Sequence, residues 1–394
     1  TLATSLILPP SPSSSAETTI STLASIGKAT TLNGVACDSK NTCLAVGARL
    51  MPPAISQGNL RALQGTDEVV RGERVFAVEL DKQTTSAVHL PDIDGQLFGI
   101  SCPSLGHCVA VGTKRTGDLG SEPLILVQHK SGWKQQSINV SYPTGTAWSR
   151  LAAISCWQVA HCVAVGTSTY EASQRDYEYS PIVVQLENGI WSQILPPSPV
   201  TQAGLTSVAC NATGSCLLLG GIGTGVTWLA SAITYTLQGE SLTGQPSIYP
   251  WLMSAVCPPA GDCLAVGQDD GTRKAVAASW SGTSWSKDSI WVPRDGFSAV
   301  SGIACSTAAC IAVGNQYFND LELFAPSRPL VERRSGGTWT RIPIWAAGAN
   351  ASNYLRGIAC FRSGKSCAIV GRMVNVDVHD DPVSVKAIFS WISN

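Results

Sequence analysis

The chain of 394 residues is 44% hydrophobic and 13% charged, with 37 glycines, 22 prolines and 14 cysteines. This composition is typical of many short buried strands joined by turns. The formal net charge of -1 offers no basic stripe to nucleic acid or to an anionic membrane, and no apolar run approaches the roughly 18 residues of a spanning helix. We therefore exclude nucleic acid as a partner and exclude membrane insertion.

The first predicted element is a strand over residues 4-10 (TSLILPP), followed by a linker over residues 11-31 that is rich in Ser and Thr. The strand is similar to WSQILPP at residues 191-197, which is the last strand of a unit that repeats along the chain. We therefore expect residues 4-10 to supply an outer strand to a unit that lacks one.

From Leu32 onwards, a unit of about fifty residues repeats seven times. Each copy has a short apolar strand that ends in Cys, a gap of four to six residues, and a second Cys that opens a strand reading roughly C-x-A-V-G. Successive first cysteines are 65, 54, 54, 47, 48 and 55 residues apart, a spacing typical of propellers. The predicted units are residues 32-91, 97-140, 151-196, 205-248, 252-292, 300-345 and 355-392.

The third unit shows the strand order most clearly. Its inner strand is residues 151-156, and the strands that follow are residues 162-167, 180-187 and 190-195. Four antiparallel strands in each of seven units predict an all-β, single-domain, seven-bladed β-propeller. The seventh unit ends after its third strand, so residues 4-10 would complete it and leave no open sheet edge. The same strand could pair with a neighbouring molecule, which predicts self-association through residues 2-10 as an alternative.

The cysteines form seven local pairs, each within one predicted hairpin. Most pairs enclose five residues and belong to separate units, which does not fit zinc ligation. Opposed hairpin residues have Cα atoms about 4.5 to 5.5 Å apart, within reach of a disulfide. The predicted bridges, which indicate an oxidising compartment, are Cys37-Cys43, Cys102-Cys108, Cys156-Cys162, Cys210-Cys216, Cys257-Cys263, Cys305-Cys310 and Cys360-Cys367.

The pattern ISC-x5-C-x-A-V-G, followed by Gly and Trp before the outer strand, resembles the disulfide-stapled repeats of secreted bacterial β-propellers. The turns at Gly282/Trp285 and Gly337/Trp339 are also similar to the Asp-box of sialidase-like propellers, although both lack the Asp. The resemblance implies a secreted or cell-surface propeller. No catalytic residue is transferred, because a shared fold does not imply a shared function. A start at Thr1 rather than Met is expected of a mature chain without its signal peptide.

Polar and aromatic residues concentrate in the connections between the second and third strands and between successive units, which lie on one face of a propeller. Flat rings there could stack on sugars or anchor a protein, but loops are polar in any case, and rings can also wedge between blades. The ligand-binding candidates are Arg115, Tyr170, Arg175, Tyr177, Trp148, Trp251, Trp291 and Trp345.

Other chemistry in the sequence is weaker. Glu171, Asp176, Asp269 and Glu322 could supply a carboxylate pair for glycosidic cleavage if two of them lay roughly 5 to 9 Å apart. Three acidic residues and one histidine lie close together near the C-terminus, but they do not match a recognisable metal-binding loop. We therefore expect no metal and no cofactor. This cluster consists of Asp377, His379, Asp380 and Asp381, and the glycosylation sequons begin at Asn139, Asn211 and Asn350.

Three functions remain open from the sequence. The first is an extracellular or cell-surface, non-catalytic propeller that binds a glycan or a protein through its loop face. The second is a carbohydrate-active enzyme, a hydrolase or lyase, with carboxylates at the channel mouth. The third is a subunit of an extracellular filament that assembles by exchange of the N-terminal strand.

Overall fold

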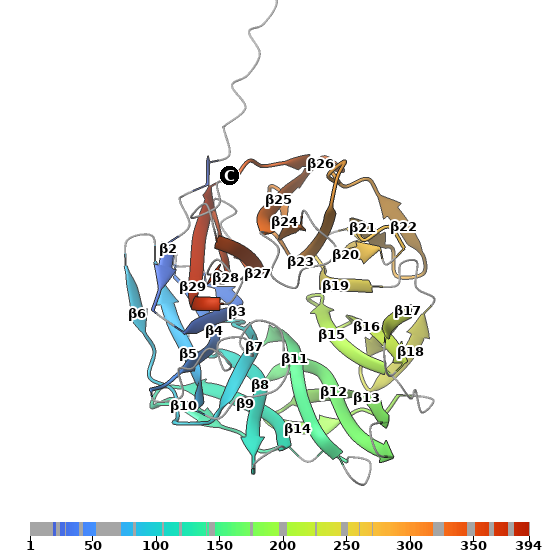
Figure 1. The fold of residues 1–394 in the computed structure, drawn as a ribbon. Coiled ribbons are helices and arrows are strands. Elements are labelled where there is room, and N and C mark those ends of the chain that lie inside the picture. The colour runs from blue at the N-terminus through green and yellow to red at the C-terminus, as the bar shows by residue number, and fades with distance from the viewer. Residues whose placement is uncertain are drawn as a thin grey trace, which may run out of the picture.

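The computed structural model is an all-β propeller whose sheets stand around a central axis (Figure 1). No helix in the described part of the chain has the length and apolar character to cross a membrane. The structure describes residues 19-20, 24-27, 29-38, 42-52, 72-81, 84-104, 106-117, 120-138, 140-141, 146-173, 176-196, 203-224, 227-245, 251-259, 261-269, 271-317, 327-344, 351-361, 366-376 and 382-393.

Each repeat is an antiparallel meander that begins with an inner strand and proceeds outward. Repeat 1 contains β3 (Thr30–Cys37), β4 (Cys43–Leu50), β5 (Glu73–Leu80) and β6 (Thr85–Ala87); repeat 2 contains β7 (Gly95–Ser101), β8 (Val109–Thr116), β9 (Gly120–His129) and β10 (Gly132–Gln135); repeat 3 contains β11 (Thr146–Gln158), β12 (His161–Ser173), β13 (Asp176–Glu187) and β14 (Ile190–Gln193); repeat 4 contains β15 (Ala203–Cys210), β16 (Cys216–Thr224), β17 (Thr227–Gln238) and β18 (Ser241–Gln245).

The remaining repeats follow the same order. Repeat 5 contains β19 (Trp251–Val256), β20 (Cys263–Asp269), β21 (Lys274–Trp280) and β22 (Trp285–Asp288); repeat 6 contains β23 (Phe297–Cys305), β24 (Cys310–Tyr317), β25 (Ser327–Ser335) and β26 (Thr338–Arg341); repeat 7 contains β27 (Ala351–Cys360), β28 (Ser366–Val376) and β29 (Pro382–Ser393). Two short strands, β1 (Thr19–Ile20) and β2 (Ala24–Ile26), precede them.

The prediction of seven separate four-stranded blades is wrong. Repeats 1, 4, 5, 6 and 7 each form a sheet of their own, but repeats 2 and 3 share one eight-stranded sheet. A parallel bridge from Trp148 on β11 to Ser121 on β9 joins them. Two small residues lie at this junction. Ser121 and Ser149 each donate a side-chain hydrogen bond of 3.3 Å to the other's carbonyl oxygen.

The open edge of β29 is covered by β1 and β2, which pair with it in antiparallel register. Ala24 lies opposite Phe389, and Ile26 lies opposite Ala387. Residues within the segment 11-31, which was expected to be a linker, therefore pair with this edge, where residues 4-10 were expected. Residues 4-10 themselves lie outside the described part of the chain.

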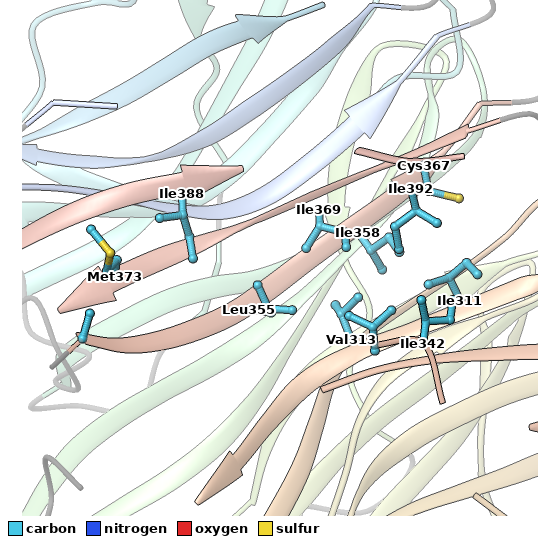
Figure 2. Packing of buried hydrophobic residues seen from close by; sticks show 12 residues of the cluster. Ile311, Val313, Ile342, Leu355, Ile358, Cys367, Ile369, Met373, Ile388 and Ile392 are labelled. Carbon is cyan, nitrogen blue, oxygen red and sulfur yellow. The ribbon is translucent and has the colours of Figure 1, made fainter. Parts of the chain in front are cut away.

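Apolar clusters fill the space between neighbouring repeats and hold the ring together. Figure 2 shows one of them, in which Ile311, Val313 and Ile342 of repeat 6 face Leu355 and Ile369 of repeat 7. Another cluster joins repeats 7 and 1, and strand β27 contacts β3, so the inner strands form a closed ring.

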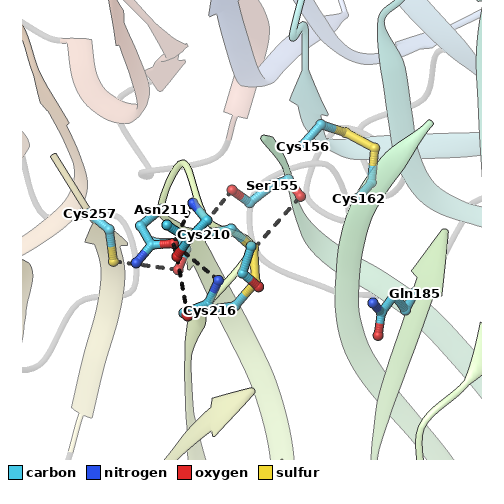
Figure 3. Close-up of a disulfide and its surroundings, with 12 residues drawn as sticks. Ser155, Cys156, Cys162, Gln185, Cys210, Asn211, Cys216 and Cys257 are labelled. Carbon is cyan, nitrogen blue, oxygen red and sulfur yellow. Dashed lines mark hydrogen bonds between the residues drawn. A yellow bond between two sulfur atoms is a disulfide. The ribbon is translucent and has the colours of Figure 1, made fainter. Parts of the chain in front are cut away.

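All seven predicted disulfides are present, each at the end of the hairpin between the first and second strands of its repeat. Hydrogen bonds link neighbouring hairpins. The Cys210 backbone N–H donates to Ser155 Oγ over 3.0 Å (Figure 3). The Cys156 backbone N–H likewise donates to Ser101 Oγ over 3.0 Å. The disulfide-bonded face is thus cross-linked within repeats and hydrogen-bonded between them.

Every inner strand carries a β-bulge at the same place, four residues before its first Cys. The pairing passes from Leu355 opposite Gly371 to Gly357 opposite Val370, which leaves Arg356 without a partner in the ladder. A bulge of this kind redirects one side chain without ending the strand. The residues skipped in this way are Asn33, Phe98, Ala152, Thr206, Met253, Ser301 and Arg356.

Candidate functional site: the central channel

The seven skipped residues together line a cavity of about 410 Å³ in the central channel. Each inner strand therefore contributes one side chain from the same level of the ring. The other lining residues are Arg150, Trp251, Ala299, Asn315, Tyr317, Tyr354, Leu355 and Arg372.

The cavity lies on the side of the ring where the inner strands begin and the second strands end. Trp251 is the first residue of β19, and Tyr317 is the last residue of β24. The connections between successive repeats lead into these inner strands from this side. The predicted ligand face and the cavity thus coincide.

Three arginines contribute to the cavity: Arg150 from repeat 3, and Arg356 and Arg372 from repeat 7. The Cζ atom of Arg150 lies 5.6 Å from the centre of the Phe98 ring, and that of Arg372 lies 5.0 Å from the centre of the Tyr354 ring. Aromatic faces stabilise a guanidinium group that is placed over them. None of the described lining residues is an Asp or a Glu.

The arginines lie in an environment that disfavours their positive charge. Burial, and then repulsion by Arg356, lowers the pKa of Arg150 from 12.5 to about 10. Burial also lowers the pKa of Arg356, and burial together with repulsion by Arg356 lowers the pKa of Arg372 well below its usual range. A bound anion would relieve this repulsion.

Tyrosines and an asparagine complete the wall beside repeat 7. Tyr317 and Tyr354 have ring centres 6.4 Å apart. Burial raises the pKa of Tyr317 to about 12, so its phenol is protonated and available as a donor at neutral pH. Asn315 Oδ1 accepts a hydrogen bond of 2.9 Å from the Leu355 backbone N–H, which fixes the Asn315 side chain between repeats 6 and 7.

Of the eight predicted ligand-binding residues, the structure places Trp251 in the cavity. Trp148 lies near the start of β11 and forms the bridge to Ser121 that joins repeats 2 and 3. Trp291 packs against the cluster between repeats 5 and 6, with the Arg341 Cζ atom 4.2 Å from its ring centre, so it is a packing residue.

Two further binding candidates, Arg115 and Tyr170, do not line the cavity. Arg115 Nε donates a hydrogen bond of 2.9 Å to the Gly117 carbonyl oxygen on its own hairpin. Tyr170 donates to the Glu178 carboxylate, and this hydrogen bond raises the pKa of the tyrosine. The side chain of Tyr177, and residues Arg175 and Trp345, lie outside the described part of the structure.

The carboxylate candidates do not form a pair among the described side chains. Asp269 Oδ1 accepts hydrogen bonds of 2.7 and 2.9 Å from the backbone N–H and the hydroxyl of Thr272, so it stabilises its own turn. Glu171 lies opposite Tyr177 in the ladder and Asp176 lies opposite Ser173, but their side chains are outside the described part, as is Glu322.

The metal candidates Asp377, His379, Asp380 and Asp381 also lie outside the described residues. The same holds for the sequon residues Asn139 and Asn350. Asn211 lies in the hairpin turn of repeat 4, where its Oδ1 accepts hydrogen bonds from the Thr213 and Ser215 backbone N–H groups, both at 3.0 Å (Figure 3).

Sequence reasoning missed the three arginines as a group. Arg356 stands within an inner strand where the other repeats have uncharged residues, and this signal becomes visible when the repeats are aligned on their first Cys. Arg372 directly follows the V-G pair of its own repeat, a pair that recurs in most repeats of the chain. Arg150 of repeat 3 comes close to the two arginines of repeat 7 only because the ring is closed, and the sequence does not show this proximity.

No family model matches the chain, and no curated protein matches it. Among solved structures, a protein of unknown function from Dyadobacter fermentans is 8% identical with a TM-score of 0.53, and the match covers 96% of this chain and 99% of that one. This likeness supports the propeller fold alone.

Two further structural matches have lower scores. A sialidase from Trypanosoma rangeli is 10% identical with a TM-score of 0.45, over 78% of this chain and 55% of the sialidase. This chain therefore spans about half the length of that sialidase. The WD40 domain of Pan2 from Neurospora crassa is 9% identical with a TM-score of 0.43, over 75% and 89% of the two chains.

Proposed function

We propose that the protein is an extracellular or cell-surface propeller that binds, without catalysis, the acidic group of a glycan in its central channel. The observation that carries this proposal is the convergence of Arg150, Arg356 and Arg372 in a cavity with no carboxylate among its described lining residues. Burial disfavours the charged form of all three arginines, and repulsion by Arg356 adds to this at Arg150 and Arg372, so an anionic ligand would offset the cost.

The cavity volume favours a small chemical group over a protein segment. A space of about 410 Å³ falls at the lower end of the range for small-molecule sites. Trp251 provides a flat apolar surface of the kind on which sugar rings stack. Seven disulfides support an extracellular location, because such bonds persist in oxidising compartments.

The alternative of a carbohydrate-active enzyme has less support. Glycosidic cleavage usually needs two carboxyl groups that flank the scissile bond. The described cavity wall supplies arginines, tyrosines and amides, and Asp269 is engaged in its own turn. Release of a bound glycan as shortened products would favour this alternative over ours.

The proposal is tested by a glycan array that contains acidic and neutral chains, followed by titration calorimetry at two salt concentrations. We expect acidic glycans to bind, with affinity falling as salt rises. Arg356→Gln should lower the affinity at least about tenfold, because it removes a buried guanidinium group from the cavity. Arg115→Gln, on a hairpin away from the cavity, is the matched control and should bind as the parent does.

Two outcomes would count against the proposal. One is equal binding of neutral and acidic glycans by the parent protein. The other is equal loss of binding in Arg356→Gln and Arg115→Gln, which would place the ligand elsewhere on the surface.

A further inference from the structure

We infer that the seven residues skipped at the inner-strand bulges form a specificity ring, which selects a small acid whose charged group is attached directly to a six-membered ring. This inference rests on the proposed function, since it assumes an acidic ligand in the channel. It adds which residues choose the ligand and what shape they choose.

The bulge separates the residues that hold the fold from the residue that faces the ligand. The position before each skipped residue is Leu or Val, and these side chains are at most 1% exposed in the clusters between repeats. The position after it is Gly, Ala or Ser, which allows neighbouring inner strands to approach closely. The skipped residue has no partner in the ladder, so its identity can vary without disturbing strand pairing.

The seven skipped residues differ in character around the ring, and their order is informative. Arg356 in repeat 7 is the one charged member, and its neighbours in repeats 1 and 6 are Asn33 and Ser301. The large apolar members, Phe98 in repeat 2 and Met253 in repeat 5, come next on either side. The ring is therefore arranged about an axis that passes through Arg356.

The two members farthest from Arg356 around the ring are small. They are Ala152 in repeat 3 and Thr206 in repeat 4, and they leave space where bulky residues would fill the channel. An acid held at Arg356 would therefore extend towards Ala152 and Thr206, with its body between Phe98 and Met253. A flat ring fits between two apolar side chains, whereas a compact inorganic anion would leave them without contact.

The polar neighbours of Arg356 are already oriented by the fold. Asn33 Nδ2 donates a hydrogen bond of 2.9 Å to the Leu97 carbonyl oxygen of the next repeat, and Ser301 Oγ donates one of 2.6 Å to the Leu355 carbonyl oxygen. These bonds fix both side chains across the junctions between repeats. The positions beside the anchoring arginine are thus preorganised, which reduces the entropy lost on binding.

The test compares four probes on the parent protein by titration calorimetry at fixed ionic strength: acetate, inorganic sulfate, benzoate and glucuronate. Benzoate and glucuronate share an acid attached to a six-membered ring, but one ring is aromatic and the other is a sugar. We expect at least one of them to bind about tenfold or more tightly than acetate and sulfate. Tight binding of benzoate alone would support the ring geometry and contradict the glycan part of the proposed function.

Variants locate the selection. Ala152→Leu fills the space opposite Arg356 and should remove the preference for the ring-bearing acid while acetate still binds. Ala308→Leu, at an exposed turn of the disulfide-bonded face, is the matched control and should keep the preference. If Ala152→Leu does not fold, Met253→Ala should weaken benzoate or glucuronate binding several-fold without changing acetate binding.

The outcomes separate the two proposals. If no probe binds, both fail. If all four bind equally and Arg356→Gln abolishes binding, the acidic-ligand function stands and the specificity ring is wrong. Retention of the preference in both Ala152→Leu and Met253→Ala would overturn the ring assignment as well.

Discussion

Glu332 on β25 is the least expected residue in the interior. It pairs with Ala312, the Ala of the C-x-A-V-G motif in repeat 6, and the residues paired with this Ala in repeats 1, 2 and 3 are Val78, Leu126 and Val184. The Glu332 side chain is fully buried. Burial raises its pKa from 4.5 to about 7, although the Trp291 backbone N–H and the charge of Arg341 oppose the shift.

This shift predicts a pH-dependent stability. The folded state binds the Glu332 proton more tightly than the unfolded state, so its stabilising contribution is present below about pH 4.5 and is lost as the pH rises towards 7. Glu332→Gln should remove up to about 3 kcal/mol of this dependence, measured by urea unfolding between pH 4.5 and 8. Glu240→Gln, at an exposed turn, is the control, and an unchanged pH profile in Glu332→Gln would contradict the assignment.

The glycine that ends the C-x-A-V-G motif recurs in every repeat, following Leu219 in repeat 4 and Val elsewhere, for a steric reason. At the bulge, the second strand lies so close to the inner strand that a Cβ atom at Gly220 would collide with the Gly204 carbonyl oxygen. Its neighbour Gly221 has nothing within 4 Å of the corresponding position.

Adjacent substitutions in repeat 4 should therefore behave differently. Gly220→Ala should lower the free energy of unfolding by about 2 to 3 kcal/mol, because the strands must separate to admit the methyl group. Gly221→Ala should change it by less than about 1 kcal/mol. Equal effects in chemical denaturation would show that the close approach at the bulge is not maintained.

At the scale of the element, the hairpin and its disulfide were predictable from sequence, because the Cys spacing and the strand pattern are both local. The bulge was not predictable, since a register shift depends on how three strands pack around the channel. Of the cavity residues, Trp251 was identified as an aromatic residue in the connection between repeats 4 and 5. The arginines were missed because a charged residue within a strand is usually assumed to face the outer solvent, whereas these side chains line the channel.

Each disulfide closes a small loop, so its effect should be local. Removal of one bridge in Cys156→Ala/Cys162→Ala should lower the free energy of unfolding by about 2 kcal/mol and leave the protein folded. The change is measured by urea unfolding with tryptophan fluorescence as the probe. A variant that is unfolded in buffer would show that a single hairpin determines the stability of the whole ring.

At the scale of the molecule, the repeat period predicted a propeller, and the structure confirms that class. The sharing of one sheet by repeats 2 and 3 was not predictable, because it depends on a single bridge between extended strand ends. The segment that covers the edge of β29 was misplaced because similarity between residues 4-10 and a later outer strand says nothing about which segment reaches that edge.

The edge of β29 provides a paired test of ring closure. Deletion of residues 1-18 leaves β1 and β2 in place and should preserve a stable monomer. Deletion of residues 1-26 removes both strands and exposes the edge of a strand whose residues Ala387 and Ile388 are buried, so we expect aggregation or unfolding. Light scattering and thermal melts compare the two, and a stable monomer after the longer deletion would contradict the closure described here.

Closure also imposes an order in time. Thr19 pairs with Ser393 and Ile26 with Ala387, so the sheet of repeat 7 joins residues that are far apart in the sequence. During synthesis, residues 19-26 must wait until residues 387-393 have been made before their partner strand exists, whereas each disulfide-bonded hairpin can form as soon as it emerges. Contacts of such high sequence separation form slowly, and an unfinished ring exposes the inter-repeat surfaces that aggregate most readily. Early oxidation of the hairpins would therefore keep each inner strand paired with its second strand during the interval in which the ring is still open.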